Sequence, residues 1–151
     1  MIRTERRIWF ECPVEVVWEA MSCTSCYTSW WPWLRRLEAG GLVAGEVWAC
    51  QVQPPLPYSL RFTIAIDEVR PCRFVRASVS GDIVGSAWVD LSPAEEGGTE
   101  VHVASDLAPA AGVLRSFARV ARPLVTWGHD WVLEQGIRQF RDRALPHGPP
   151  A

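Results

Sequence analysis

The chain has 151 residues, which is enough for one domain with a sizeable hydrophobic core. Apolar residues make up 48% of it and charged residues 21%, a balance that excludes intrinsic disorder. The formal net charge is −2 and the arginines are scattered, so we expect no nucleic-acid partner.

The N-terminal residues and the cysteines indicate in which cellular compartment the protein is expected. Residues 1–7 are mostly charged and lack the apolar core of a signal peptide. No run approaches the ~18 apolar residues of a membrane-spanning helix. We therefore expect a cytoplasmic protein without an integral membrane segment, with its five cysteines as reduced thiols.

Cys23 and Cys26 have the spacing of a redox pair or half a zinc site, but no second pair accompanies them, so we expect no metal and no cofactor.

The N-terminal part predicts a strand followed by two short helices. Residues 2–11 mix apolar and charged side chains in the manner of a strand. Pro13 suits the first turn of a helix, on which Val16, Val17 and Ala20 share one face. Residues 22–29 are small and polar, as in a turn, and a second short helix or turn is expected over residues 28–34.

A meander of strands follows, separated by Gly and Pro turn signals. The predicted strands are residues 46–53, 59–69, 73–81, 83–92 and 99–107. From about residue 110 to residue 144 the spacing is helical, and Pro123 is expected to kink or split this helix. The stripe expected to face the sheet is Phe117, Ala121, Leu124, Gly128, Trp131 and Gln135.

This order of elements predicts the α+β class, with an antiparallel sheet of about seven strands covered by the long C-terminal helix. If the sheet is strongly curved, sheet and helix enclose a cavity. Residues 1–145 are expected to form this single domain, and residues 146–151 a disordered tail.

Tryptophan is the most informative residue type, because five of the nine tryptophans fall in residues 30–33 and 127–131. Indole is large, rigid and apolar, so it suits the wall of a cavity that holds an apolar ligand. Alternatively, the indoles fill the interior and leave no cavity. The candidate ligand-binding residues with apolar side chains are Trp31, Trp33, Trp48, Phe62, Trp88, Trp127 and Trp131.

Three polar residues are candidates for chemistry or for orienting a ligand. His129 is the candidate catalyst, because an imidazole titrates near neutral pH and can move a proton. The alternative is a boundary histidine bonded to the backbone or to a strand side chain. Arg76 and Asp106 are the strand-borne candidates for ligand binding or for an acid/base pair with His129. Arg76 alternatively lies on the wet face of the sheet, because a buried arginine needs a carboxylate partner.

Several motifs, in this order, carry a family resemblance. They are residues 12–18 (Cys-Pro-Val-Glu-Val-Val-Trp), 31–33 (Trp-Pro-Trp), 81–88 (Gly-Asp-Ile-Val-Gly-Ser-Ala-Trp), 97–101 (Gly-Gly-Thr-Glu-Val) and 127–132 (Trp-Gly-His-Asp-Trp-Val). With them the chain resembles the START-like, or Bet v 1-like, superfamily (SRPBCC) over about residues 2–144, and within it the bacterial polyketide cyclase/dehydrase and lipid-transport group. The resemblance implies a helix-grip fold, in which a curved antiparallel sheet wraps around the C-terminal helix and two short helices follow the first strand.

Three functions fit these observations. The first is a binding or carrier protein for a hydrophobic small molecule, such as a lipid, an isoprenoid, a quinone or a polyketide. The second is an enzyme of the cyclase or dehydratase type with His129 as its acid/base. The third is an interaction domain whose pocket is filled. A monomer or a homodimer is expected in each case.

Overall fold

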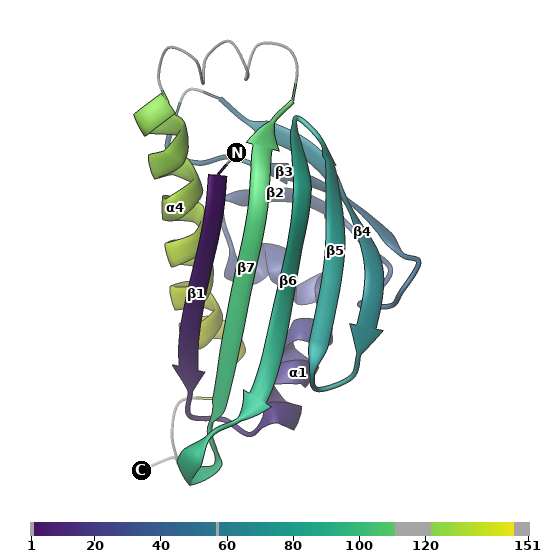
Figure 1. Ribbon diagram of the computed structural model, residues 1–151, viewed down its shortest axis with the longest axis vertical. Coiled ribbons are helices and arrows are strands. Elements are labelled where there is room, and N and C mark those ends of the chain that lie inside the picture. Colours follow the sequence, from purple (N-terminus) through teal and green to yellow (C-terminus); the bar gives the residue numbers. More distant parts are fainter. Residues whose placement is uncertain (1, 57, 111–121, 147–151) are drawn as a thin grey trace.

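The computed structural model describes residues 2–56, 58–110 and 122–146. Its centre is one antiparallel sheet in the order β1-β7-β6-β5-β4-β3-β2 (Figure 1). The strands are β1 (Ile2–Phe10), β2 (Leu34–Glu38), β3 (Val47–Val52), β4 (Leu60–Arg70), β5 (Phe74–Gly81), β6 (Ile83–Pro93) and β7 (Thr99–Pro109). The predicted α+β class and seven-stranded sheet are confirmed, and β2 is the strand for which the sequence analysis gave no bounds.

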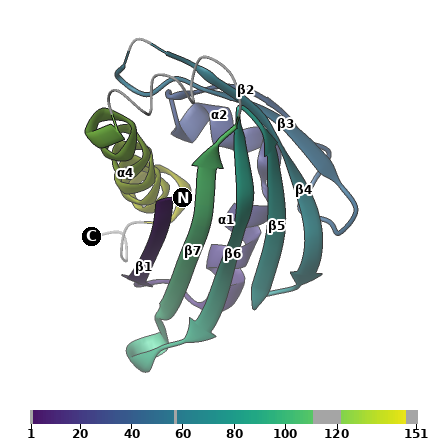
Figure 2. The same cartoon turned by 45° about the horizontal axis from the view of Figure 1, so that its top comes forward.

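The helices gather on the concave side of the sheet, which bends strongly from β4 to β2 (Figure 2). They are α1 (Val14–Ser22), the 3₁₀ turn η1 (Thr24–Cys26), α2 (Tyr27–Trp30), α4 (Arg122–Gln139) and the π-helical turn η3 (Phe140–Ala144). A further 3₁₀ turn, η2 (Glu95–Gly97), lies in the β6–β7 hairpin at the end of the sheet. None of the described helices is long and apolar enough to span a membrane.

The second short helix ends earlier than predicted. It spans only Tyr27–Trp30, and Trp31 already has extended dihedrals of φ −117° and ψ 94°. A proline disfavours the helical conformation of the residue before it, and Pro32 follows Trp31. The chain therefore leaves the helix within residues 30–33, which we call the tryptophan motif, and enters β2 at Leu34.

Two predictions about the C-terminal helix reach outside the described residues. Pro123 is the second residue of α4 as described, and the segment before Arg122, on which a kink or split depends, is outside them. The tail beyond Pro146 is outside them as well.

The described part of α4 faces the interior with Val132, Leu133, Gly136 and Ile137. Phe117 and Ala121 of the predicted stripe lie outside the described residues. The rest of the stripe is wrong by about one residue, and Leu124 within it is 48% exposed.

Alternation along the strands separates two faces of the sheet. On β5, Val75, Ala77 and Val79 are buried, whereas Arg76 and Ser78 between them are exposed. Directly paired residues of neighbouring strands point to the same side, so the register extends this division across the sheet. We call the side of Val75, Ala77 and Val79 the inner face and the opposite side the outer face.

The expectation of five reduced thiols is wrong for two of them. Cys23 and Cys26 form a disulfide, whereas Cys12, Cys50 and Cys72 are free. A 3₁₀ turn brings residues three apart to the same side of the backbone, and their Cα atoms here are 5.4 Å apart, within the range for a disulfide. The disulfide closes the turn between α1 and α2.

Candidate functional site

Two adjoining apolar cavities lie between the inner face and the helices. The α1 cavity, about 370 Å³, is lined by Val17 and Met21 of α1 and by inner-face residues such as Ala77. The His129 cavity, about 350 Å³, lies beside His129, Ser105 and Leu107. Both are lined by Tyr27, Trp31, Trp33, Trp48, Ile64, Val132 and Leu133. This shared wall makes them neighbouring parts of one apolar interior.

The tryptophan motif docks onto the C-terminal helix through its indole N–H groups. Trp31 Nε1 donates to the carbonyl oxygen of Gly136 at 3.0 Å, and Trp33 Nε1 donates to Gln139 Oε1 at 2.9 Å. The two rings are stacked with centroids 5.4 Å apart, and the ring of Tyr27 lies 4.9 Å from that of Trp31. Because both donors are satisfied at the helix, the ring faces are left to form an apolar wall.

Five of the predicted site residues lie at the cavities. Trp31, Trp33 and Trp48 line both of them, and Phe62 and His129 line the His129 cavity. Trp48 is 7% exposed and donates from Nε1 to the carbonyl of Gly41 at 2.9 Å. The structure therefore brings together the first tryptophan cluster (residues 30–33), β3, β4 and one residue, His129, of the second cluster (residues 127–131).

Three other predicted residues lie on the outer face, away from the cavities. Arg76 is exposed, pairs directly with Trp88 and has Nη2 3.9 Å from Glu68 Oε1. The ring of Trp88 meets His102 edge to face at 4.7 Å. Asp106 pairs with Arg3 on one side and Ser86 on the other, again outward. Arg76, Trp88 and Asp106 are thus not wall residues of the apolar interior, because they occupy the other phase of the strand alternation.

The tryptophans of the second cluster do not line the two cavities either. Trp127 is 48% exposed, and Trp131 lines a separate surface groove of about 520 Å³ with Pro32, Pro54 and Leu56. Gly128 between them is buried against the β3–β4 loop, where an added Cβ would come within 2.7 Å of Leu56 Cδ1. Gly128 and Trp131 of the predicted stripe therefore face this loop, whereas the neighbouring stripe with Val132 and Gly136 faces the α1 cavity.

His129 is the most unusual polar residue at the cavities. Its side chain is 20% exposed, and its Nδ1 is buried without a hydrogen-bond partner among the described residues. Asp130 Oδ1 is 3.8 Å from Nδ1, too far for a hydrogen bond. Burial lowers the pKa of His129, and Arg6 lowers it further, while the charge of Asp130 opposes the shift. At pH 7 the imidazole is therefore neutral and can accept a proton.

Sequence reasoning missed several wall residues. Val132, Leu133, Gly136, Ile137 and Phe140 follow helical spacing, so this stripe was readable, but the tryptophans drew attention to its neighbour. Tyr27 was also missed. Burial raises its pKa above the usual range, and its hydroxyl donates to the carbonyl of Met21. No local signal marks Tyr27, because its burial depends on packing between α2 and β3.

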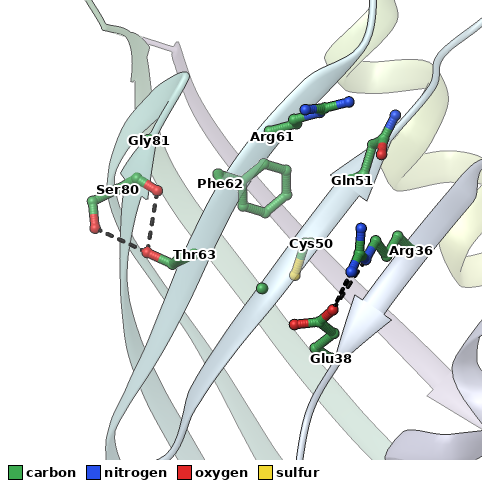
Figure 3. Close-up of a pocket in the computed structure, with 10 residues that line it drawn as sticks. Arg36, Glu38, Cys50, Gln51, Arg61, Phe62, Thr63, Ser80 and Gly81 are labelled. Atoms are coloured by element: carbon green, nitrogen blue, oxygen red, sulfur yellow. Dashed lines mark hydrogen bonds and ion pairs between the residues drawn. The ribbon is translucent and has the colours of Figure 1, made fainter.

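The outer face carries a polar groove of about 400 Å³ along β2, β3 and β4 (Figure 3). Arg36 Nε donates to Glu38 Oε1 at 3.1 Å, and the hydroxyls of Thr63 and Ser80 are 3.3 Å apart. These exposed groups are paired with each other, so we assign the candidate site to the apolar cavities. Among the residues that the structure describes, no three His, Cys, Asp or Glu side chains gather as a metal site would require.

Known structures share this arrangement at low sequence identity. No protein-family model matches the chain, and no curated protein matches it. The Zhui aromatase/cyclase from Streptomyces sp. R1128 is 14% identical, with a TM-score of 0.78 over 95% of this chain and 93% of that one. A START superfamily protein from Mycobacterium smegmatis is also 14% identical, with a TM-score of 0.72 over 94% and 96%. The Aha1 dimer from Colwellia psychrerythraea is 12% identical, with a TM-score of 0.64 over 99% and 100%. The element order, the wrapped sheet and these likenesses together show that the chain has the START-like, or Bet v 1-like, helix-grip fold.

Proposed function

We propose that this protein binds a hydrophobic small molecule between the inner face of the sheet and α4, as a binding or carrier protein. The observation that carries the proposal is the wall of the two cavities, which is almost entirely aliphatic and aromatic. Their volumes, about 370 and 350 Å³, lie above the ~300 Å³ at which small-molecule sites begin. This space favours a ligand over the alternative of an interaction domain with a filled pocket. A lipid, an isoprenoid, a quinone or a polyketide would each suit such a wall.

A neutral apolar fluorophore tests the proposal directly. N-phenyl-1-naphthylamine is expected to bind the wild-type protein with enhanced emission. Ala77→Phe places a ring into the α1 cavity, since Ala77 is 7% exposed and lines it. We expect this variant to bind the probe at least ~10-fold more weakly, which corresponds to about 1.4 kcal/mol.

The matched control is Ala65→Phe, the same substitution on the opposite face. Ala65 pairs directly with Ser78, which is exposed. This variant is expected to keep the wild-type affinity. If the probe fails to bind the wild type, or binds Ala77→Phe and wild type equally, the cavity is not the binding site. Native mass spectrometry of freshly purified protein would then identify any ligand retained from the cell.

A second candidate function is an enzyme of the cyclase or dehydratase type. The observation that favours it is a neutral, largely buried His129 at the cavity wall. Such a base removes a proton from the carbon next to a carbonyl, and in D₂O the carbanion takes up deuterium. We expect faster deuterium exchange at the methyl group of 2-acetylnaphthalene with the wild type than with His129→Leu. Equal rates in the two proteins would contradict this role.

A further inference from the structure

A pair of hydroxyl groups that the sequence did not single out reaches the wall of the His129 cavity through one of its members. Ser105 of β7 lines this cavity, and its Oγ is 2.8 Å from Oγ1 of Thr4 on β1. Thr4 is 8% exposed. The two hydroxyls carry two hydrogens, and their mutual bond uses one of them. Neither hydroxyl has a second hydrogen-bond partner among the described residues, so one O–H donor is left over at the cavity wall.

Along the common direction of β1 and α4, His129 lies at about the same position as this hydroxyl pair. β1 and α4 run side by side in the same direction (Figure 1), and Arg6 Nε donates to Glu134 Oε1 at 3.0 Å. Two residues back along a strand is about 6.6 Å, and four residues back along a helix is about 6 Å. Thr4 precedes Arg6 by two residues, and Asp130 precedes Glu134 by four. Both therefore lie about the same distance from the Arg6–Glu134 ion pair, in the same direction, and His129 is next to Asp130.

The remaining wall of this cavity is apolar apart from Tyr27 and Cys50. The hydroxyl of Tyr27 is already bound to the carbonyl of Met21. Cys50 is buried, and burial raises the pKa of its thiol to about 12, so it stays a neutral, weak donor. The unmet hydrogen-bonding capacity at the wall thus lies with His129 and with Ser105, whose hydroxyl is paired with that of Thr4. A buried donor without a partner is costly, and a ligand oxygen that accepts from it recovers that cost.

We propose that Ser105, Thr4 and His129 form a polar subsite for one uncharged acceptor oxygen, so that the ligand is an apolar molecule carrying a carbonyl or hydroxyl group at this end. The inference rests on the proposed function, because it specifies what the cavity holds. Arg6 is already paired with Glu134, so the subsite offers no unpaired cation for a carboxylate. A neutral oxygen matches the neutral donors, whereas a carboxylate would be buried without a counter-charge.

The test compares two probes of nearly equal shape, 2-acetylnaphthalene and 2-isopropenylnaphthalene, by quenching of tryptophan fluorescence. They differ by a carbonyl oxygen in place of a methylene group. The double variant Thr4→Val/Ser105→Ala removes both hydroxyls, so that neither is left without a partner. We expect it to weaken binding of the ketone about 3- to 10-fold, the range of one hydrogen bond, and to leave binding of the alkene unchanged. His129→Leu is the second variant, with an effect in the same direction.

The control is Ser86→Ala, which removes an exposed hydroxyl on the outer face of β6. It should change neither affinity. An equal change for ketone and alkene in both subsite variants overturns the polar subsite while leaving the cavity as a binding site. Tighter binding of 2-naphthoate than of the ketone also overturns it, because the site would then select a carboxylate. If neither the ketone nor the alkene binds the wild type, the proposed function fails together with the subsite.

Discussion

Two glycines of α4 show how much one missing side chain decides. Gly128 lies against the β3–β4 loop, where a Cβ would come within 2.7 Å of Leu56 Cδ1 and 2.8 Å of Tyr58 Oη. Gly136 has more room, since its nearest neighbour would be Trp33 Cζ2 at 3.4 Å. In an open helical position, alanine is more favourable than glycine by about 1 kcal/mol. The same substitution should therefore have opposite effects at the two positions.

We expect Gly136→Ala to raise the free energy of unfolding by about 0.5–1 kcal/mol. Gly128→Ala should lower it by about 1 kcal/mol, because Leu56 and Tyr58 must move and the loop loses its fit to the helix. Urea unfolding followed by tryptophan fluorescence measures both. Equal stabilisation of the two variants would show that the loop does not pack on Gly128.

The lowered pKa of His129 gives a dependence of stability on pH. Its ordinary value is 6.5, and burial holds the folded-state pKa below that. As the pH falls through 6.5, the unfolded chain binds a proton that the folded protein does not yet bind. The free energy of unfolding contributed by His129 is therefore complete above 6.5 and decreases as the pH falls toward the folded-state pKa.

The variant His129→Leu should show a weaker loss of stability between pH 7.5 and pH 5.5 than the wild type. Other titrating groups act in both proteins, so the difference between the two curves isolates the histidine. Thermal unfolding by circular dichroism at a series of pH values is the measurement. Parallel curves would mean that His129 titrates alike in the folded and unfolded states.

At the scale of elements, the link between the tryptophan motif and α4 closes the cavity wall. The chain leaves α2 after Trp30, and the indoles of Trp31 and Trp33 reach the end of α4 at Gly136 and Gln139. The partner of Trp31 is a backbone carbonyl, which cannot move away from its helix. The hydrogen bond of Trp31 therefore holds together two segments that are 105 residues apart in sequence.

Trp31→Phe keeps an aromatic ring but removes the donor to the Gly136 carbonyl. We expect a loss of about 1–3 kcal/mol in the free energy of unfolding, because a part-buried acceptor loses its partner. Trp127→Phe is the matched control, since Trp127 is 48% exposed, and it should stay within about 0.5 kcal/mol. Guanidinium unfolding of the two variants measures both free energies of unfolding. Similar losses in the two variants would contradict a stabilising role for the Trp31 hydrogen bond.

At the scale of the whole molecule, ligand binding and folding are linked. The cavity walls come from β1, α1, α2, the inner face of the sheet and α4, so the cavity exists only in the folded chain. A ligand that binds only the folded state raises the free energy of unfolding by about 2.7 kcal/mol at a free concentration of 100 times its Kd.

We therefore expect N-phenyl-1-naphthylamine at that concentration to raise the Tm of the wild type by about 5–10 °C. Because Ala77→Phe binds the probe at least ~10-fold more weakly, its rise at the same probe concentration should be at most about half as large, whereas Ala65→Phe should behave as the wild type. Calorimetry measures the shift without interference from the fluorescence of the probe. An equal rise in all three proteins would indicate binding outside the α1 cavity.

The periodicity of the strands made much of the fold predictable. The alternation of Val75, Ala77 and Val79 with polar residues is a local property, and it yielded β5 and its neighbours nearly to the residue. The site was less predictable. Of the predicted ligand-binding residues, Trp31, Trp33, Trp48 and Phe62 line the cavities, whereas Arg76, Trp88 and Asp106, predicted beside them, lie on the outer face. Residue type alone does not show which phase of a strand faces inward.

The sequence by itself determined the class of the fold, the order of its elements and the apolar character of the interior, because these follow from spacing and composition along the chain. Only the tertiary structure decided how α4 is rotated, which tryptophans line the interior, and that Thr4 and Ser105 meet beside it. Helix rotation depends on contacts such as Gly128 with Tyr58, and the hydroxyl pair joins two strands through residues that are 101 positions apart in the sequence. Such contacts form between distant segments, so no local pattern records them.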